Sequence, residues 1–166
     1  MSLCGLGGTF GEAQVVVNDA FEDPSAISIG VIEPRKNGTI RGFRNYDALT
    51  QIIRDLGFSM PETITGQDAA RIDISAELSD QFEADFMIST YWPANGTTVA
   101  AIYELWDSTL PIWRETLHAV RNNQYFMIER EKQRPVTFES LDYVLGVLVS
   151  QIATRDFVPL GPDTSH

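Results

Sequence analysis

The stretch Leu110–Ile128 places the strongest constraint on how this chain folds. Pro111 is pre-organised for a first helical turn, and Trp113 leads into a brief helical piece. The pair Asn122–Asn123 then marks a tight turn, because asparagine tolerates left-handed backbone conformations. Four consecutive apolar residues, Tyr125–Ile128, follow. A short apolar run bounded by turn signals is typical of a strand covered on both faces, so the stretch predicts a helix that leads into a core strand.

Two more apolar runs predict central strands, and amphipathic segments separate them. The strands are expected at Ile27–Ile32 and Phe86–Ser89. Helical spacing of apolar residues predicts helices over Tyr46–Leu56, Val99–Trp106 and Thr137–Ile152. Because strands and helices alternate, the expected fold is a three-layer α/β/α domain with a mainly parallel central sheet.

Local signals add detail around these elements. Asn37–Gly38 predicts a hairpin turn, after which Thr39–Phe43 returns antiparallel to the first strand. Asn45 or Asp47 is expected to cap the following helix, and Gly57 lies just past its end.

Two later helices are also expected, whereas one early segment stays open. Ser75 is a predicted N-cap, with Leu78 and Phe82 forming the apolar stripe of the helix that follows. Residues 12–21 fit either a short helix or a strand. The last helix is expected to bury one face, made of Phe138, Leu141, Val144, Leu145, Leu148 and Ile152.

Composition limits the function. The chain has 166 residues, 43% of them hydrophobic and 21% charged, which predicts one globular domain with a sizeable core. Its net charge of −11 argues against a sequence-independent nucleic-acid or anionic-membrane binder. An anionic ligand would therefore need locally clustered arginines. The single cysteine, Cys4, excludes an intramolecular disulfide, and no apolar signal region precedes it as a lipid anchor would require.

The order of motifs in the second half resembles the ending of the class III substrate-binding proteins of ABC importers, which carry ferric siderophores, haem and cobalamin. That order is proline-x-tryptophan, the segment Leu117–Asn123, a strand, a loop and a closing helix. The family has leu-pro-ala-val-lys-asn-gly at this segment. Here His118 replaces the usual proline and Asn123 the usual glycine.

The resemblance extends towards the amino terminus and implies a domain organisation. Thr39–Phe43 with its following helix, and Ile74–Leu78 with its ile-ser-x-glu pattern, are similar to family segments. Members have two α/β lobes joined by a long helix, with the ligand held between the lobes. The resemblance thus implies that residues 26–157 are the carboxyl-terminal lobe, without its amino-terminal partner lobe. Residues 1–25 would be a remnant of the interlobe helix or vector-derived residues, and 158–166 a tail.

Polar and aromatic residues follow the predicted strands. Ligands of open α/β sheets collect outside the carboxyl ends of the strands. Arginine offers forked donors to carboxylate or hydroxamate oxygens, and aromatic faces stack on flat chelate groups. Each arginine taken singly also fits a solvated charge, and the two aromatics after the second strand also fit core or lid positions. The candidate ligand-binding residues are Arg41, Arg44, Tyr46, Tyr91, Trp92, Arg130 and Arg134.

The family resemblance implies a transport role without enzymatic activity or a resident cofactor. The ligand would be a ferric siderophore or related iron chelate, the partner an ABC permease, and the location periplasmic or lipid-anchored outside the cytoplasm. Glu77 resembles the acidic residue that docks on the permease, although it also fits a helix start, where negative charge is favoured. Trp113 and His118 are expected to pack in the interior. A small α/β enzyme and a stand-alone interaction module remain as alternatives.

Overall fold

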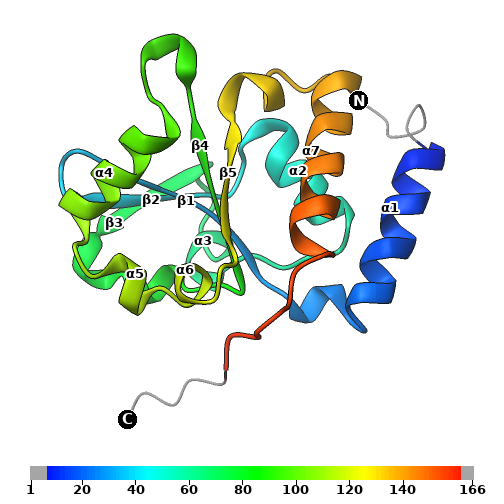
Figure 1. Ribbon diagram of the computed structural model, residues 1–166, viewed down its shortest axis with the longest axis horizontal. Coiled ribbons are helices and arrows are strands. Elements are labelled where there is room, and N and C mark those ends of the chain that lie inside the picture. The colour runs from blue at the N-terminus through cyan, green and yellow to red at the C-terminus, as the bar shows by residue number, and fades with distance from the viewer. Residues whose placement is uncertain (1–6, 162–166) are drawn as a thin grey trace.

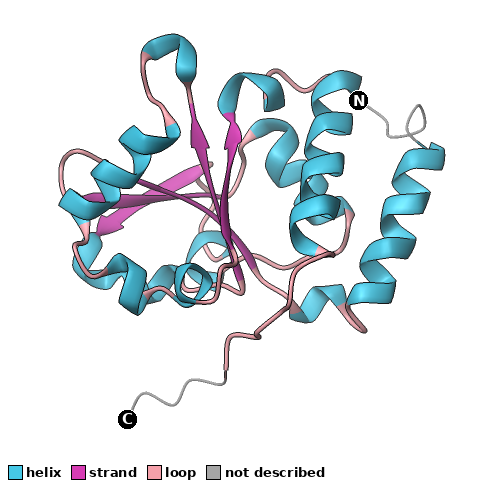
Figure 2. Ribbon diagram, in the orientation of Figure 1, coloured by secondary structure: helices cyan, strands magenta, loops and turns pink. Residues whose placement is uncertain are grey.

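The computed structural model describes residues 7–161, which form a central sheet with helices on both faces (Figures 1 and 2). The sheet has five strands in the order β3-β2-β1-β4-β5. Helices α4, α5 and α6 lie on one side of β4 and β5 in the view of Figure 1, and α2, α7 and α1 on the other. This layered arrangement confirms the predicted α/β fold class.

Four of the five strands point in the same direction. β1 (Ile29–Pro34), β4 (Phe86–Tyr91) and β5 (Tyr125–Glu129) pair in parallel. β2 (Thr39–Phe43) is antiparallel to β1, and β3 (Arg71–Ser75) is antiparallel to β2. Every residue of β1 is buried, as expected for a strand covered on both faces. The mainly parallel sheet and the hairpin return are therefore confirmed.

The first strand is displaced from its predicted bounds. It was expected over Ile27–Ile32 but begins at Ile29 and runs to Pro34. Before Ile29 the chain forms only an isolated parallel bridge, between Ser28 and Ser59, and Ser28 N–H donates to the Asp85 carboxylate at 2.8 Å. The other two central strands contain their predicted residues and extend slightly further.

The edge strand β3 was not predicted, although Ile72 and Ile74 alternate with polar residues in the pattern typical of a strand. Its residues alternate between exposed and half-buried, because successive side chains of a strand point to opposite faces of the sheet. It pairs with β2 from Thr39↔Ser75 to Phe43↔Arg71. Gly42 in β2 is required by packing, since a Cβ there would lie 2.8 Å from Ile64 Cδ1 and 2.9 Å from Phe82 Cζ.

The helix predicted after Ser75 is wrong in type and in its cap. Residues Ala76–Phe82 form 3-10 turns (η3), Ser75 makes no capping hydrogen bond, and Leu78 leaves helical geometry. Leu78 is also 45% exposed, whereas Phe82 is buried as predicted. Ala76 N–H donates to Gly38 O at 3.1 Å, which attaches the start of η3 to the hairpin.

Helix α2 (Asp47–Asp55) is confirmed, but its predicted caps are not used. Tyr46 is the N-cap residue, and its backbone N–H donates to Thr50 Oγ1 at 2.7 Å. Asp47 has a positive φ of 49°, and Arg134 forms an ion pair with its carboxylate. Gly57 follows the helix with φ 93°, the left-handed conformation expected of a terminating glycine.

Helix α7 (Phe138–Ile152) is also confirmed, with one correction on its buried face. Thr137 caps it: Ser140 N–H donates to Thr137 Oγ1 at 3.1 Å, and Thr137 N–H donates to Ser140 Oγ at 2.8 Å. Phe138 is 48% exposed, contrary to prediction, because it lies at the helix end and at the margin of the apolar stripe. The buried face consists of Leu141, Val144, Leu145, Leu148 and Ile152.

The segments at both ends of the described chain pack on the same core. α1 (Gly7–Ala20) resolves the open question over residues 12–21 as a helix, and it packs against α7. Phe21 lies edge-on to Phe86 and Phe157, with ring centroids 6.3 Å and 5.3 Å away. In the tail, Leu160 N–H donates to the Asp85 carboxylate at 2.6 Å. Cys4 lies outside the described residues.

The helices of the other face confirm the packing role of Trp113. They are α4 (Val99–Thr109), α5 (Trp113–Thr116) and α6 (His118–Arg121). Trp113 is fully buried and stacks on Trp106 at 5.2 Å. The predicted helical piece is divided in two, because Leu117 adopts an extended conformation between α5 and α6.

Two further predictions around α6 are confirmed. His118 is buried, with its Nε2 2.8 Å from Val158 O. Asn123 has φ 57°, the left-handed conformation expected at the turn before β5.

Short helical turns complete the described chain. Within residues 7–161, no helix combines the length and apolar character needed to cross a bilayer. The turns are η2 (Pro24–Ala26), α3 (Glu62–Thr65), η4 (Pro93–Asn95) and η5 (Arg130–Gln133).

Candidate binding site

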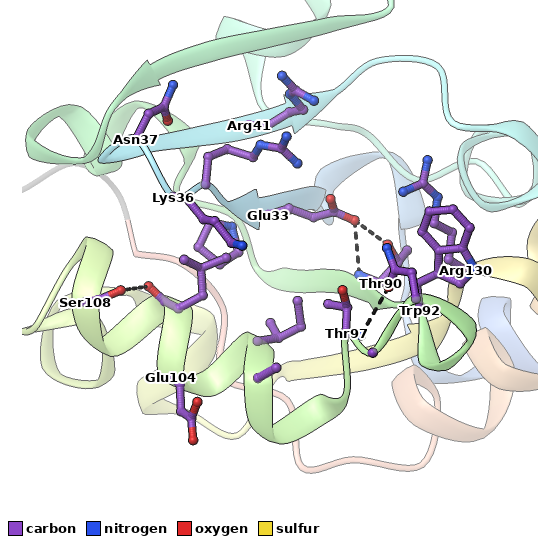
Figure 3. A pocket seen from close by; sticks show the side chains of 17 residues that line it. Glu33, Lys36, Asn37, Arg41, Thr90, Trp92, Thr97, Glu104, Ser108 and Arg130 are labelled. Atoms are coloured by element: carbon purple, nitrogen blue, oxygen red, sulfur yellow. Dashed lines mark hydrogen bonds between the residues drawn. The ribbon is translucent and has the colours of Figure 1, made fainter.

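A cavity of about 910 Å³ lies at the carboxyl ends of β1, β4 and β5 (Figure 3). Parallel strands end at the same edge of a sheet, so the segments that follow them face one another there. The β1–β2 hairpin forms one wall and α4 the opposite wall. Its lining includes Glu33, Arg35, Lys36, Arg41, Thr90, Trp92, Thr97, Ala101, Leu105 and Arg130.

One wall of the cavity is cationic, although the whole chain carries a net charge of −11. Arg41 is held by Asp73 across the β2–β3 pair, with Nε at 2.7 Å from Oδ1 and Nη2 at 2.9 Å from Oδ2. This contact raises the pKa of Arg41 and lowers the pKa of the Asp73 carboxyl. Among the described residues, Arg35 and Arg130 form no ion pair, so their charges are available to a ligand.

The indole ring of Trp92 lies beside these cations. The guanidinium of Arg130 lies 4.7 Å from the centroid of the Trp92 ring, which is close enough for a cation–π contact. The Trp92 indole N–H donates to the Glu131 carboxylate. The backbone of Trp92 donates to Thr97 O at 2.8 Å, which closes the loop that carries the indole.

The floor of the cavity holds a buried acid that the sequence analysis did not single out. Glu33 is 9% exposed, and its Oε1 accepts hydrogen bonds from Thr90 N–H, at 3.3 Å, and from the Thr90 hydroxyl. Tyr46 Oη lies 3.2 Å from Thr90 Oγ1. Burial is the largest cause of the raised pKa of Glu33 and of the raised pKa of Tyr46. The available signal was an acidic residue that ends an apolar run.

The structure brings five of the seven predicted ligand residues to this region. Arg41, Trp92 and Arg130 line the main cavity. Tyr46 and Arg134 line an adjoining depression of about 350 Å³, which also includes Glu33, Arg41 and Arg130. Arg134 forms an ion pair with Asp47 there.

The other predicted residues lie elsewhere. Arg44 Nη1 donates to Asp68 O at 3.2 Å and does not line the cavity. Tyr91 is half-buried and packs against the core, so it takes the structural role that was left open. Glu77 lies exposed in η3. In residues 7–161, no group of three or more His, Cys, Asp or Glu side chains is arranged to hold a metal ion.

The fold of this chain is similar to that of solved periplasmic binding proteins of the FhuD fold family. One similar solved structure is the FhuD fold-family component of a Fep/Fec-like ferrichrome ABC transporter from Bacillus subtilis. It matches with a TM-score of 0.71 and 18% identity over 92% of this chain and 55% of that chain. No protein-family model and no curated protein matches the sequence.

Two further structures show the same relationship. SirA of Staphylococcus aureus matches with a TM-score of 0.63 and 17% identity, covering 89% of this chain and 56% of that chain. FhuD of Vibrio cholerae, solved with Fe³⁺–Desferal bound, matches with a TM-score of 0.60 and 13% identity. The match covers 89% of this chain and 51% of that chain. This chain therefore spans about half the length of the structures it matches, and the fold implied by the sequence resemblance is confirmed.

Proposed function

We propose that this chain is one lobe of a substrate-binding protein that delivers a ferric siderophore to an ABC importer. The observation that carries the proposal is the cavity at the strand ends, where Arg35, Arg41 and Arg130 gather beside the Trp92 ring. Guanidinium groups bind carboxylate and hydroxamate oxygens, and an aromatic face stacks on a flat chelate. Solved structures of the same fold include a component of a ferrichrome ABC transporter and a siderophore binding protein, which supports this ligand class.

The lobe is proposed to be the carboxyl-terminal one of a two-lobed protein outside the cytoplasm, periplasmic or lipid-anchored. Support comes from the share of the solved structures that the chain spans, about half in each case. The opposite lobe would cover the cavity and complete the ligand's surroundings. In this proposal residues 26–157 are the lobe, α1 derives from the joining helix, and the permease contacts Glu77. The role is binding and delivery, without catalysis.

Equilibrium dialysis against a ferric trihydroxamate complex tests the proposal. We expect saturable binding in the micromolar-to-millimolar range, and we expect Arg130→Ala to weaken it about tenfold because a charge-assisted contact is lost. Arg121→Ala is the matched control, since Arg121 is exposed in α6 and does not line the cavity. No saturable binding up to several millimolar, or equal loss in both variants, would refute the proposed site.

A further inference from the structure

Glu33 is the group that the proposed function leaves unexplained. It lines a cavity otherwise suited to anions, yet it is an acid with only 9% of its surface exposed. Among the described residues it takes part in no ion pair. A buried carboxylate without a paired cation is costly, so such a residue at the floor of a binding cavity indicates a role towards the ligand.

The two oxygens of the Glu33 carboxylate differ in their surroundings. Oε1 accepts both hydrogen bonds from Thr90, whereas Oε2 accepts none from any described residue. In residues 7–161, the one fully buried side-chain nitrogen or oxygen without a partner is Gln133 Nε2. Oε2 therefore retains some exposure, towards the main cavity or the adjoining depression, both of which Glu33 lines. The side chain thus keeps an unpaired acceptor at the strand-end region where the candidate ligand residues gather.

The groups behind Glu33 fix its orientation. Thr90 has one hydroxyl hydrogen, which it donates to Glu33 Oε1, so Tyr46 is the donor in the contact between the Tyr46 and Thr90 hydroxyls. Tyr46 is itself held by stacking on Phe43 at 4.2 Å. Figure 3 shows the Glu33 carboxyl tied to Thr90 at the base of the cavity, while Glu104 points away from it. Glu33 is thus a positioned acceptor.

The surrounding charges determine which donor suits it. Arg35, Lys36, Arg41 and Arg130 line the same cavity, so a cationic group of a ligand would be repelled by its neighbours. A neutral donor has no such penalty and still satisfies the free oxygen. Building on the proposed function, we propose that Glu33 is a specificity-determining residue: it accepts a hydrogen bond from a neutral N–H donor on the chelate while the arginines hold the chelate's anionic oxygens.

A pair of probes and a pair of variants test this inference. The probes are the ferric complex of a trihydroxamate with peripheral secondary-amide N–H groups and the ferric complex of its N-methylated analogue, both titrated into this chain by equilibrium dialysis. In Glu33→Gln the side-chain oxygen must face the Thr90 N–H, so an amide donor replaces the free acceptor. Glu104→Gln removes the same charge from an exposed residue that lines the same cavity.

We expect the wild-type chain to prefer the N–H complex by about tenfold or more, and Glu33→Gln to abolish that preference. Glu104→Gln should keep the preference. If Glu33→Gln retains it, the N-methyl groups are excluded by shape and the inference is wrong. Equal affinities of the wild-type chain for the two complexes would also overturn it, while leaving the proposed function intact. Failure of both complexes to bind the wild-type chain would overturn the proposed function and this inference together.

Discussion

At the scale of single residues, the surroundings of Asp73 and Glu33 shift the pKa values of their carboxyl groups in opposite directions. Asp73 is paired with Arg41 across two strands, and the contact lowers the pKa of its carboxyl. Glu33 has hydrogen bonds from Thr90 but no paired cation, and burial raises its pKa. The first arrangement favours the charged form, whereas the second opposes it.

Glu33 should therefore reduce the stability of the folded chain at neutral pH. Its folded pKa lies above the ordinary value of 4.5, so the cost is absent below that value and grows as the pH rises towards the folded pKa. We expect Glu33→Gln to raise the free energy of unfolding at pH 7 and to change it little at pH 4. Urea unfolding at both pH values measures this. An equal gain at both would show that packing, not ionisation, is responsible.

Glu77 carries the proposed permease contact at the same scale. In the two-lobed protein with its permease, we expect Glu77→Lys to leave chelate binding intact and to lower stimulated ATP hydrolysis about tenfold, because repulsion replaces attraction. Glu139→Lys is the control, since Glu139 is also exposed in the first turn of a helix. If Glu77→Lys lowers only the melting temperature, as Glu139→Lys should, Glu77 is a helix-start residue and docks nothing.

At the scale of elements, the hairpin and its edge strand form the cationic wall of the cavity. β2 carries Arg41, and β3 supplies the Asp73 that orients it. The η3 segment packs beneath them through Phe82, against Gly42. The position of the wall therefore depends on close approach between β2 and η3.

A pair of glycine substitutions tests that close approach. Gly42→Ala should cost about 1–3 kcal/mol in unfolding free energy, because the added Cβ would overlap Ile64 and Phe82. Gly146→Ala is the matched control: Gly146 lies exposed inside α7 with nothing within 4 Å of an added Cβ, and it should gain about 0.4–1 kcal/mol. Chemical denaturation measures both. A neutral Gly42→Ala would mean that η3 shifts freely.

At the scale of the whole molecule, the chain presents an open binding surface on a complete core. α1 packs on α7, and both faces of the sheet are covered. The cavity at the strand ends has walls from the hairpin and α4. In the proposed two-lobed protein, the second lobe would close it.

Affinity should reflect that missing surface. A single lobe contacts only one side of the ligand and lacks the pre-organised surface of the second lobe. Binding should therefore be weaker, by several kcal/mol, than binding by a two-lobed protein. We expect no nanomolar binding of ferric trihydroxamates to this chain alone, as measured by quenching of tryptophan fluorescence. Trp92 is the reporter, because Trp106 and Trp113 are fully buried. Nanomolar affinity would show that one lobe suffices and would refute the two-lobe account of the site.

The sequence by itself determined the elements whose signals are local. Apolar runs located β4 and β5, helical periodicity located α2 and α7, and the conformations of Gly57 and Asn123 followed from residue chemistry. Each of these signals is set by neighbours within a few residues, so it is readable without the fold. The strand ends also indicated where Arg41, Trp92 and Arg130 would gather.

Only the tertiary structure decided the features that depend on distant partners. The place of β3 at the edge of the sheet follows from its pairing with β2, and the segment after Ser75 forms 3-10 turns that pack against β2 and β3. The Arg44 guanidinium donates to the backbone carbonyl of Asp68 and does not line the cavity. Glu33 and Thr90 meet although they are 57 residues apart, because β1 and β4 are adjacent parallel strands. Burial and hydrogen-bond partners of a polar side chain are set by such pairings, which local sequence patterns do not encode.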